Sequence, residues 1–174
     1  SQAEHDEEAR AILVTDSDHL IKKVNYYISH FLNRISRKSI AYKSVKSNGL
    51  AVLIKNIDEA ALIANYMAPE HLQIMSQNKK KLSKNITNAG AMFIGNYTPE
   101  ALGDYLAGPS HVLPTSGNAR FDSGLSVIDF LKRTSYIESS KNGLKKLSYS
   151  IKVLGDSEGL DAHVKSAMIR FTEK

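Results

Sequence analysis

The sequence contains no cysteine. Disulfide bridges and thiolate metal sites are therefore excluded, and any bound metal must be held by imidazole, carboxylate, amide or water ligands. The absence of cysteine is also compatible with a reducing cytosol. With 174 residues, of which 42% are hydrophobic, the chain is long enough for one globular domain with a substantial core and a small appendage.

Long apolar runs are missing as well. No segment approaches the roughly 20 consecutive apolar residues that cross a bilayer. The acidic start, with Glu4, Asp6, Glu7 and Glu8, is unlike a secretory or organellar targeting segment. We therefore expect a soluble, cytoplasmic protein with no membrane partner. Because the chain begins with Ser rather than Met, and without linker residues, we also expect it to be a truncated form of a longer protein.

Basic residues outnumber acidic ones, which gives a net charge of +5. Lysine and arginine gather in three clusters, at residues 34–38, 79–84 and 141–146. These clusters lie on separate segments, have no interleaved aromatic residues and belong to no nucleic-acid-binding motif. We interpret them as solvated helix faces and loop ends, and we expect no nucleic-acid partner. A basic nucleic-acid-binding module is the alternative, and it requires tight binding that depends steeply on salt.

Apolar periodicity predicts alternating strands and helices. Short apolar runs typical of buried strands occur at residues 11–15, 49–55, 71–75 and 91–95. The helices predicted between them cover residues 18–36, whose apolar stripe should cover a sheet, then 57–67, 78–84 and 99–106. Asn56 with Glu59 forms a capping-box-like start, and Thr98 with Pro99 supplies an N-cap and a first helical residue. This alternation is typical of a parallel α/β sheet.

Residues 107–123 form a long segment without periodicity that contains two Gly and two Pro. A long loop of this kind is a functional candidate in its own right. After it, Ser126 with Asp129 is expected to cap a short helix, and residues 134–137 are predicted to form a strand.

The pattern is helical from Ser139 to the end of the chain. We therefore divide the chain into residues 1–138, part of an α/β domain, and residues 139–174, a helical tail. One face of the tail carries an apolar stripe that requires a partner surface, formed by Leu160, Val164, Ala167, Met168 and Phe171.

Several polar residues could take part in chemistry. Gln2 and His5 are three residues apart, so on a helix both side chains would project from one face and could share a metal. Taken alone, a Gln-x-x-His pair occurs by chance in many helices. Taken alone, Asp104 is equally a helix-surface acid, and His163 is equally a partly buried histidine at a packing face.

Glu70 and His71 are adjacent and follow Pro69. The proline favours an extended conformation for Ala68, which predicts that the pair lies at a helix-to-strand junction. A surface glutamate beside a histidine at the edge of the core is the alternative interpretation. Histidine titrates near neutral pH, so His71 is suited to repeated proton transfer.

Four segments together carry a resemblance to a known family. They are SQAEHD at residues 1–6, APEHL at 68–72, the run from NAGAMFIG to LKRTS at 88–135, and EGLDAH at 158–163. The sequence closely resembles the C-terminal part of histidinol dehydrogenase, the enzyme of the last two steps of histidine synthesis. The resemblance implies an incomplete Rossmann-like parallel-sheet domain followed by a helical tail.

The resemblance also implies the site. Gln2, His5, Asp104 and His163 fall on the four zinc-ligand positions of the family, and Glu70 and His71 fall on its catalytic pair. His71 would remove and return protons, and Glu70 would activate the water that attacks the aldehyde intermediate. L-histidinol would be bound by a larger set of residues, namely Gln2, His5, His71, Asp104, His111, Glu158 and His163.

In the family, the tail of one subunit completes the site of its neighbour in a homodimer, which assigns Glu158 and His163 to the partner's site. His111 could instead satisfy backbone groups of its loop, and Glu158 could be an acid at a helix N-terminus. Two mild departures from the family pattern, Ser110 for Asn and Ser116 for Gly, lie near His111 and touch no implied zinc ligand.

The sequence has no G-x-G-x-x-G phosphate loop. The resemblance implies that NAD binds mostly to an N-terminal part absent from this chain, and that no residue of this segment holds it. We therefore expect the chain alone to bind zinc weakly or not at all and to be inactive. The alternatives are a non-catalytic remnant or split subunit, and a related dehydrogenase of another amino alcohol.

Overall fold

The computed structural model describes residues 1–171. It divides into two compact units, Ser1–Phe130 and Leu131–Lys174. The last three residues of the predicted tail, 172–174, lie outside the described residues. No helix among the described residues is both long and apolar enough to cross a membrane.

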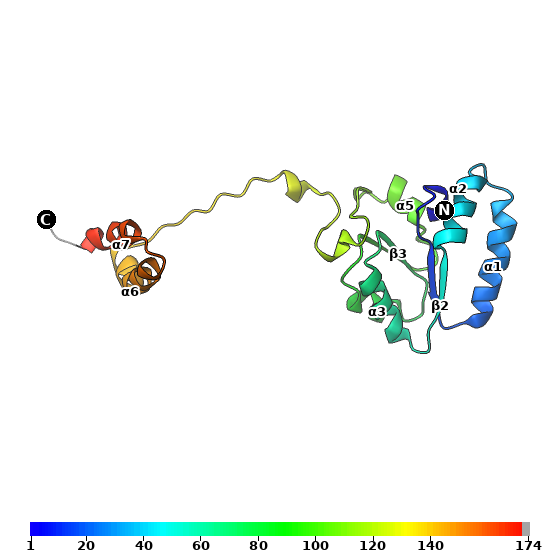
Figure 1. Cartoon of the computed structure of the whole chain (residues 1–174), viewed down its shortest axis with the longest axis horizontal. Helices are drawn as coiled ribbons and strands as arrows, with labels where there is room; N and C mark the ends of the chain where they lie inside the picture. Colours follow the sequence, from blue (N-terminus) through cyan, green and yellow to red (C-terminus); the bar gives the residue numbers. More distant parts are fainter. Residues whose placement is uncertain (172–174) are drawn as a thin grey trace. The chain divides into compact units, whose positions relative to one another are not determined.

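The first unit begins with a parallel strand pair covered by two helices (Figure 1). Strand β1 (Ile12–Thr15) pairs with β2 (Leu50–Leu53), so that Ile12 lies opposite Leu50. Helix α1 (Asp18–Leu32) starts where the Ser17 hydroxyl accepts a hydrogen bond from the Leu20 amide, 3.2 Å away. Its half-buried stripe packs on β1 and β2, as the periodicity predicted.

The predicted extension of α1 to Ser36 is wrong, since the helix ends at Leu32 and a separate helix, α2 (Lys38–Asn48), follows. Helix α2 was not predicted because the residues it buries, Ala41 and Ser44, are small or polar and give no apolar stripe. The Ser44 hydroxyl donates to the carbonyl of Ala9 at 2.8 Å, which satisfies a buried polar group and fixes α2 against the start of the chain.

A second parallel pair, β3 (His71–Ile74) with β4 (Ala91–Ile94), lies beside α3 (Ile57–Met67) and α4 (Lys79–Asn85). Asn56 caps α3, as predicted, by accepting from the Asp58 amide at 3.0 Å. Small alanines on α3 let the helix pack closely on the strands. The buried core here consists of Ala61, Ala64, Ile74, Leu82 and Ile86. The predicted parallel α/β class is confirmed, although the described strands form two separate pairs.

The segment that follows β4 is largely irregular. It holds α5 (Glu100–Tyr105) and two short 3-10 helices, η2 (Asn118–Arg120) and η3 (Val127–Phe130). Pro99 is the N-cap of α5 in place of the predicted Thr98, whose hydroxyl instead donates to the Ile94 carbonyl at 3.1 Å. The predicted pairing of Ser126 with Asp129 is present at the start of η3, where the Asp129 carboxylate accepts from the Ser126 amide at 2.7 Å and from its hydroxyl at 3.2 Å.

The strand predicted at residues 134–137 is wrong. These residues have no regular structure, and Tyr136 and Ile137 are 94% and 93% exposed. A strand needs a neighbour for its backbone hydrogen bonds, and no described strand pairs with this segment.

The second unit is a helical hairpin of α6 (Lys141–Ser157) and α7 (Asp161–Met168), followed by the 3-10 helix η4 (Ile169–Phe171). Our expectation that the stripe of the tail needs an outside partner is wrong in part, because Val164 and Ala167 are buried within the unit. Gly155 permits this packing, since a β-carbon there would lie 2.5 Å from Cγ2 of Val164.

Replacing Gly155 with alanine should therefore destabilise the hairpin by about 1–3 kcal/mol, as expected for overpacking. Gly143→Ala on the same helix is the matched control, because its new β-carbon would meet only serine hydroxyls at 3.0 and 3.3 Å. Both changes improve helix propensity by about 1 kcal/mol. Hydrogen exchange of the α6 and α7 amides measures the difference in stability between the two variants. Equal protection in both would contradict the packing described.

Candidate functional site

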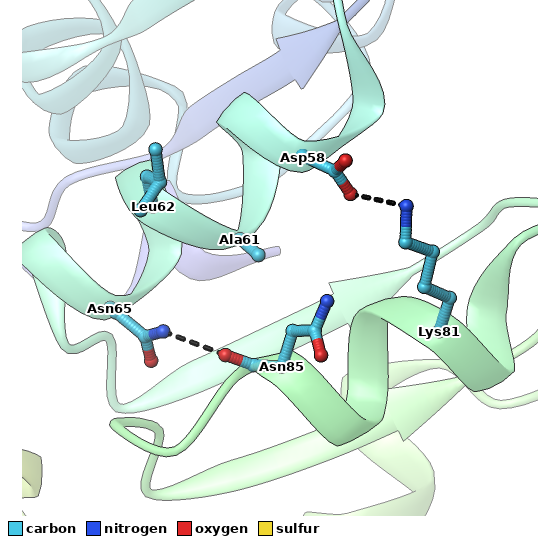
Figure 2. Close-up of a pocket in the computed structure, with 6 residues that line it drawn as sticks. All are labelled: Asp58, Ala61, Leu62, Asn65, Lys81 and Asn85. Atoms are coloured by element: carbon cyan, nitrogen blue, oxygen red, sulfur yellow. Dashed lines mark hydrogen bonds and ion pairs between the residues drawn. The ribbon is translucent and has the colours of Figure 1, made fainter.

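A hollow between α3 and α4 does not coincide with the predicted site (Figure 2). Its polar groups satisfy one another: Lys81 pairs with Asp58 at 2.6 Å, and Asn65 donates to the Asn85 carbonyl at 2.8 Å. None of the predicted catalytic or metal-binding residues lines this hollow.

The predicted catalytic pair lies at the junction of α3 and β3, as expected. The turn itself differs from our expectation, because Ala68 is left-handed, with φ 47° and ψ 61°, rather than extended. Ala68 is fully buried, and its amide still donates to the Ala64 carbonyl at 2.8 Å. A left-handed conformation costs a non-glycine residue about 1–2 kcal/mol, so surrounding contacts must hold the turn in place.

Two neighbouring segments hold this turn. Arg120 of η2 donates to the carbonyl of Tyr66, near the end of α3. On the other side, the Gly90 amide donates to Pro69 at 2.9 Å, and the Ala91 amide donates to Glu70 at 2.9 Å. The turn that carries the predicted catalytic pair is therefore held by the irregular segment and by the start of β4.

His71 lies between two carboxylates of α5. Its Nδ1 is 3.7 Å from Oε1 of Glu100, and its Nε2 is 3.9 Å from Oδ1 of Asp104. The three side chains are only 15%, 15% and 22% exposed. Glu100 and Asp104 are four residues apart on one helix, which places both on the same face. The ring of Phe93 lies 6.0 Å from the imidazole, centroid to centroid, and borders it on a further side.

A group able to bind a metal ion adjoins His71. His5, Glu100 and Asp104 can each present one ligand atom, and these atoms all lie within 4.8 Å of one another. The Arg37 guanidinium donates to the His5 carbonyl at 3.2 Å and so ties the N-terminal turn to α2. One imidazole with two carboxylates is a donor set that suits a borderline divalent cation such as zinc.

Gln2 occupies the 3-10 helix η1 (Gln2–Glu4), immediately before His5. Its Oε1 is buried and has no hydrogen-bond partner in the described part of the chain. A buried acceptor without a partner is costly, and a bound cation would satisfy it. The environment of Gln2 and the cluster around His5 therefore fit the metal that the sequence predicted.

The other predicted residues are His111, Glu158 and His163. His111 is exposed in the irregular segment. Glu158 and His163 belong to the second unit, where Glu158 ends α6 and His163 is exposed on α7. Two of our alternative interpretations are wrong as a result: Glu158 is not at a helix N-terminus, and His163 is not buried at a packing face.

Sequence reasoning missed Glu100, which lies beside His71 and belongs to the metal-binding group. The signal that could have revealed it is its spacing from Asp104, since acids four residues apart on a predicted helix share a face. Arg120 was also missed. Its partner is the carbonyl of Tyr66, 54 positions earlier in the sequence, and no local pattern reports such a contact.

Residues 1–171 match the family model for histidinol dehydrogenase. A histidinol dehydrogenase of Acinetobacter baylyi is 47% identical over 171 residues, covering 98% of this chain and 40% of that protein. One of Bacillus cereus is 45% identical over 174 residues, covering 100% of this chain and 41% of that protein. The chain spans about 40% of the length of the curated relatives it matches.

A solved structure is similar as well. The crystal structure of histidinol dehydrogenase from Elizabethkingia anophelis superposes with a TM-score of 0.90 at 31% sequence identity. The superposition covers 97% of this chain and 39% of the solved chain.

Proposed function

Because the chain belongs to the histidinol dehydrogenase family, we propose that it carries the proton-transferring and metal-binding part of an enzyme that oxidises L-histidinol to L-histidine. The observation that supports this most directly is the position of His71. Both of its ring nitrogens are buried and have no hydrogen-bond partner among the described residues, and they lie between two carboxylates that belong to the metal-binding group. A histidine held in this way is available to exchange protons with a substrate.

The reaction requires two oxidations and one addition of water. Converting the alcohol to histidinaldehyde removes a hydroxyl proton and a hydride, and His71 is placed to take the proton. Water must then add to the aldehyde to form a gem-diol, and the half-buried Glu70 is the carboxylate we assign to activate that water. A second hydride and proton leave to give the carboxylate, so His71 must return to its neutral form between steps.

Zinc would be held by Gln2, His5 and Asp104 together with His163 of the partner subunit. When bound, the metal would supply coordination positions that orient the imidazole and amino groups of the substrate. Glu100 lies close enough to add a negative charge to this site. In this proposal His111 and the partner's Glu158 contribute to substrate binding.

Two NAD molecules per turnover would accept the two hydrides. The residues of this chain offer no phosphate loop, so we assign the nucleotide site mostly to sequence that the relatives have and this chain does not. The assembled enzyme is proposed to be a homodimer in which each tail, residues 139–174, completes the neighbour's site.

The test is formation of NADH from L-histidinol in the presence of zinc. The chain would be assayed alone, and then mixed with the separately expressed N-terminal part of the Acinetobacter baylyi relative. Turnover is expected in the mixture and not in either part alone. A chimera in which this chain replaces the matching segment of that relative removes the need for the two parts to associate. A folded chimera that forms no NADH would contradict the proposed function.

A further inference from the structure

We propose that Glu100 is a positioning residue that fixes the tautomer of His71. In this arrangement the protonated Nδ1 of the imidazole donates a hydrogen bond to the Glu100 carboxylate, and the lone pair of Nε2 is left to exchange protons. The assignment rests on the proposed function of His71 and deepens it, because it names the atom through which the histidine acts.

The geometry pairs two groups that otherwise have no partner. Nδ1 of His71 and Oε1 of Glu100 are both buried, both lack a hydrogen bond among the described residues, and face each other at 3.7 Å. A buried polar group without a partner costs about 1–3 kcal/mol, and a small rotation of either side chain would close this gap. Catalytic hydrogen bonds are often long before substrate binds and shorten in the complex.

The scaffold restricts the other motions of the ring. Phe93 is buried beside the imidazole. Helix α5 approaches Phe93 closely at Gly103, where a β-carbon would lie 2.6 Å from Cε1 of the phenyl ring. The ring of His71 is thus bordered by Phe93 and by the helix that carries both carboxylates, so each nitrogen keeps its own carboxylate neighbour.

The two carboxylates then have different tasks. Asp104 lies 3.9 Å from Nε2 and Glu100 lies 3.7 Å from Nδ1, and both carboxylates belong to the metal-binding group. In this assignment Asp104 is the zinc ligand, whereas Glu100 holds the Nδ1 proton and stabilises the imidazolium that forms when Nε2 takes a proton. This is the role that a buried carboxylate plays for the histidine of a hydrolase triad.

The test determines which nitrogen of His71 carries the proton. The sample is the 174-residue chain, labelled with 15N and freed of metal by a chelator, at a pH where the imidazole is neutral. Long-range proton–nitrogen correlation spectra distinguish a protonated ring nitrogen from a bare one. We expect the proton on Nδ1 in the unmodified chain and a shift towards Nε2 in Glu100→Ala. Glu100→Gln keeps an acceptor oxygen and should largely retain the Nδ1 tautomer. Glu138→Ala, at an exposed acid of the second unit, is the control.

Two outcomes would overturn the assignment. One is a proton on Nε2 in the unmodified chain. The other is a tautomer that Glu100→Ala leaves unchanged while the amide spectrum shows an intact fold. These measurements need no substrate or NAD, so their failure is separate from a failure of the proposed activity.

In the active chimera the same variants give a second readout. Both Glu100→Ala and Glu100→Gln should lower kcat for L-histidinol by about 10- to 100-fold, since each loses the charge that stabilises the imidazolium. KM should change little, because Glu100 does not contact substrate in this assignment. An effect confined to KM would contradict it.

Discussion

Replacing His71 with asparagine in the active chimera is expected to lower kcat for L-histidinol oxidation by about 100- to 10,000-fold, the usual contribution of a general acid and base. Asparagine is close to histidine in size and keeps polar atoms near Glu100 and Asp104, but it cannot take up and return a proton. The fold should remain, because neither ring nitrogen has a hydrogen-bond partner among the described residues. Steady-state and single-turnover NADH formation measure the effect.

His19→Asn is the matched control for this change. His19 is an exposed residue on the first turn of α1 and has no part in the site. Its replacement should leave kcat within about a factor of two, as for most surface substitutions away from structural features. Equal losses in the two variants would show that His71 is not the proton-transferring group.

Replacing Gly90 with alanine is expected to have the largest effect on the conformation of the catalytic pair. A β-carbon at residue 90 would lie 2.6 Å from the carbonyl oxygen of Glu70, a backbone atom that cannot rotate away. The two segments would have to separate, and the hydrogen bonds that residues 90 and 91 donate to Pro69 and Glu70 would weaken. We expect a loss of about 1–3 kcal/mol in the free energy of unfolding of the first unit.

Gly124→Ala is the control within the same unit. Its β-carbon would meet the end of the Leu113 side chain at 2.9 Å, and this flexible group can move aside. Both variants lower the entropy of the unfolded chain by the same amount. The difference between their free energies of unfolding therefore reports the backbone clash. Hydrogen exchange of the β3 and β4 amides measures it. Unchanged protection in Gly90→Ala would mean that the two segments are less closely fitted than the structure shows.

Much of the first unit was predictable because its elements carry strong local signals. The strands β1 to β4 are short apolar runs, and α3 has both an apolar face and an asparagine cap. Helix α2 gave no such signal, since its contacts depend on Ala41 and on the Ser44 hydroxyl, which bonds to a residue 35 positions earlier. The predicted strand at residues 134–137 shows the opposite error, because this segment contains strand-favouring residues but has no neighbouring strand among those described.

The same distinction holds at the site. The resemblance to the family singled out Glu70, His71 and Asp104, since each of them taken alone also had an ordinary structural interpretation. The left-handed turn at Ala68 was not predictable, because alanine disfavours that conformation and Pro69 favours an extended one before it. Contacts distant in sequence, such as the one from Arg120 to Tyr66, hold the turn. Only the folded chain shows them.

The most direct test of the proposed metal site is anomalous diffraction at the zinc edge from crystals of the active chimera. The expected result is a zinc peak about 2.0–2.2 Å from a ring nitrogen of His5 and a carboxylate oxygen of Asp104. Gln2 and His163 of the partner subunit should complete the ligand set, and the imidazole of His71 should face the site without binding the metal. A zinc peak away from His5 and Asp104, or one bound by His71, would contradict the roles assigned to these residues.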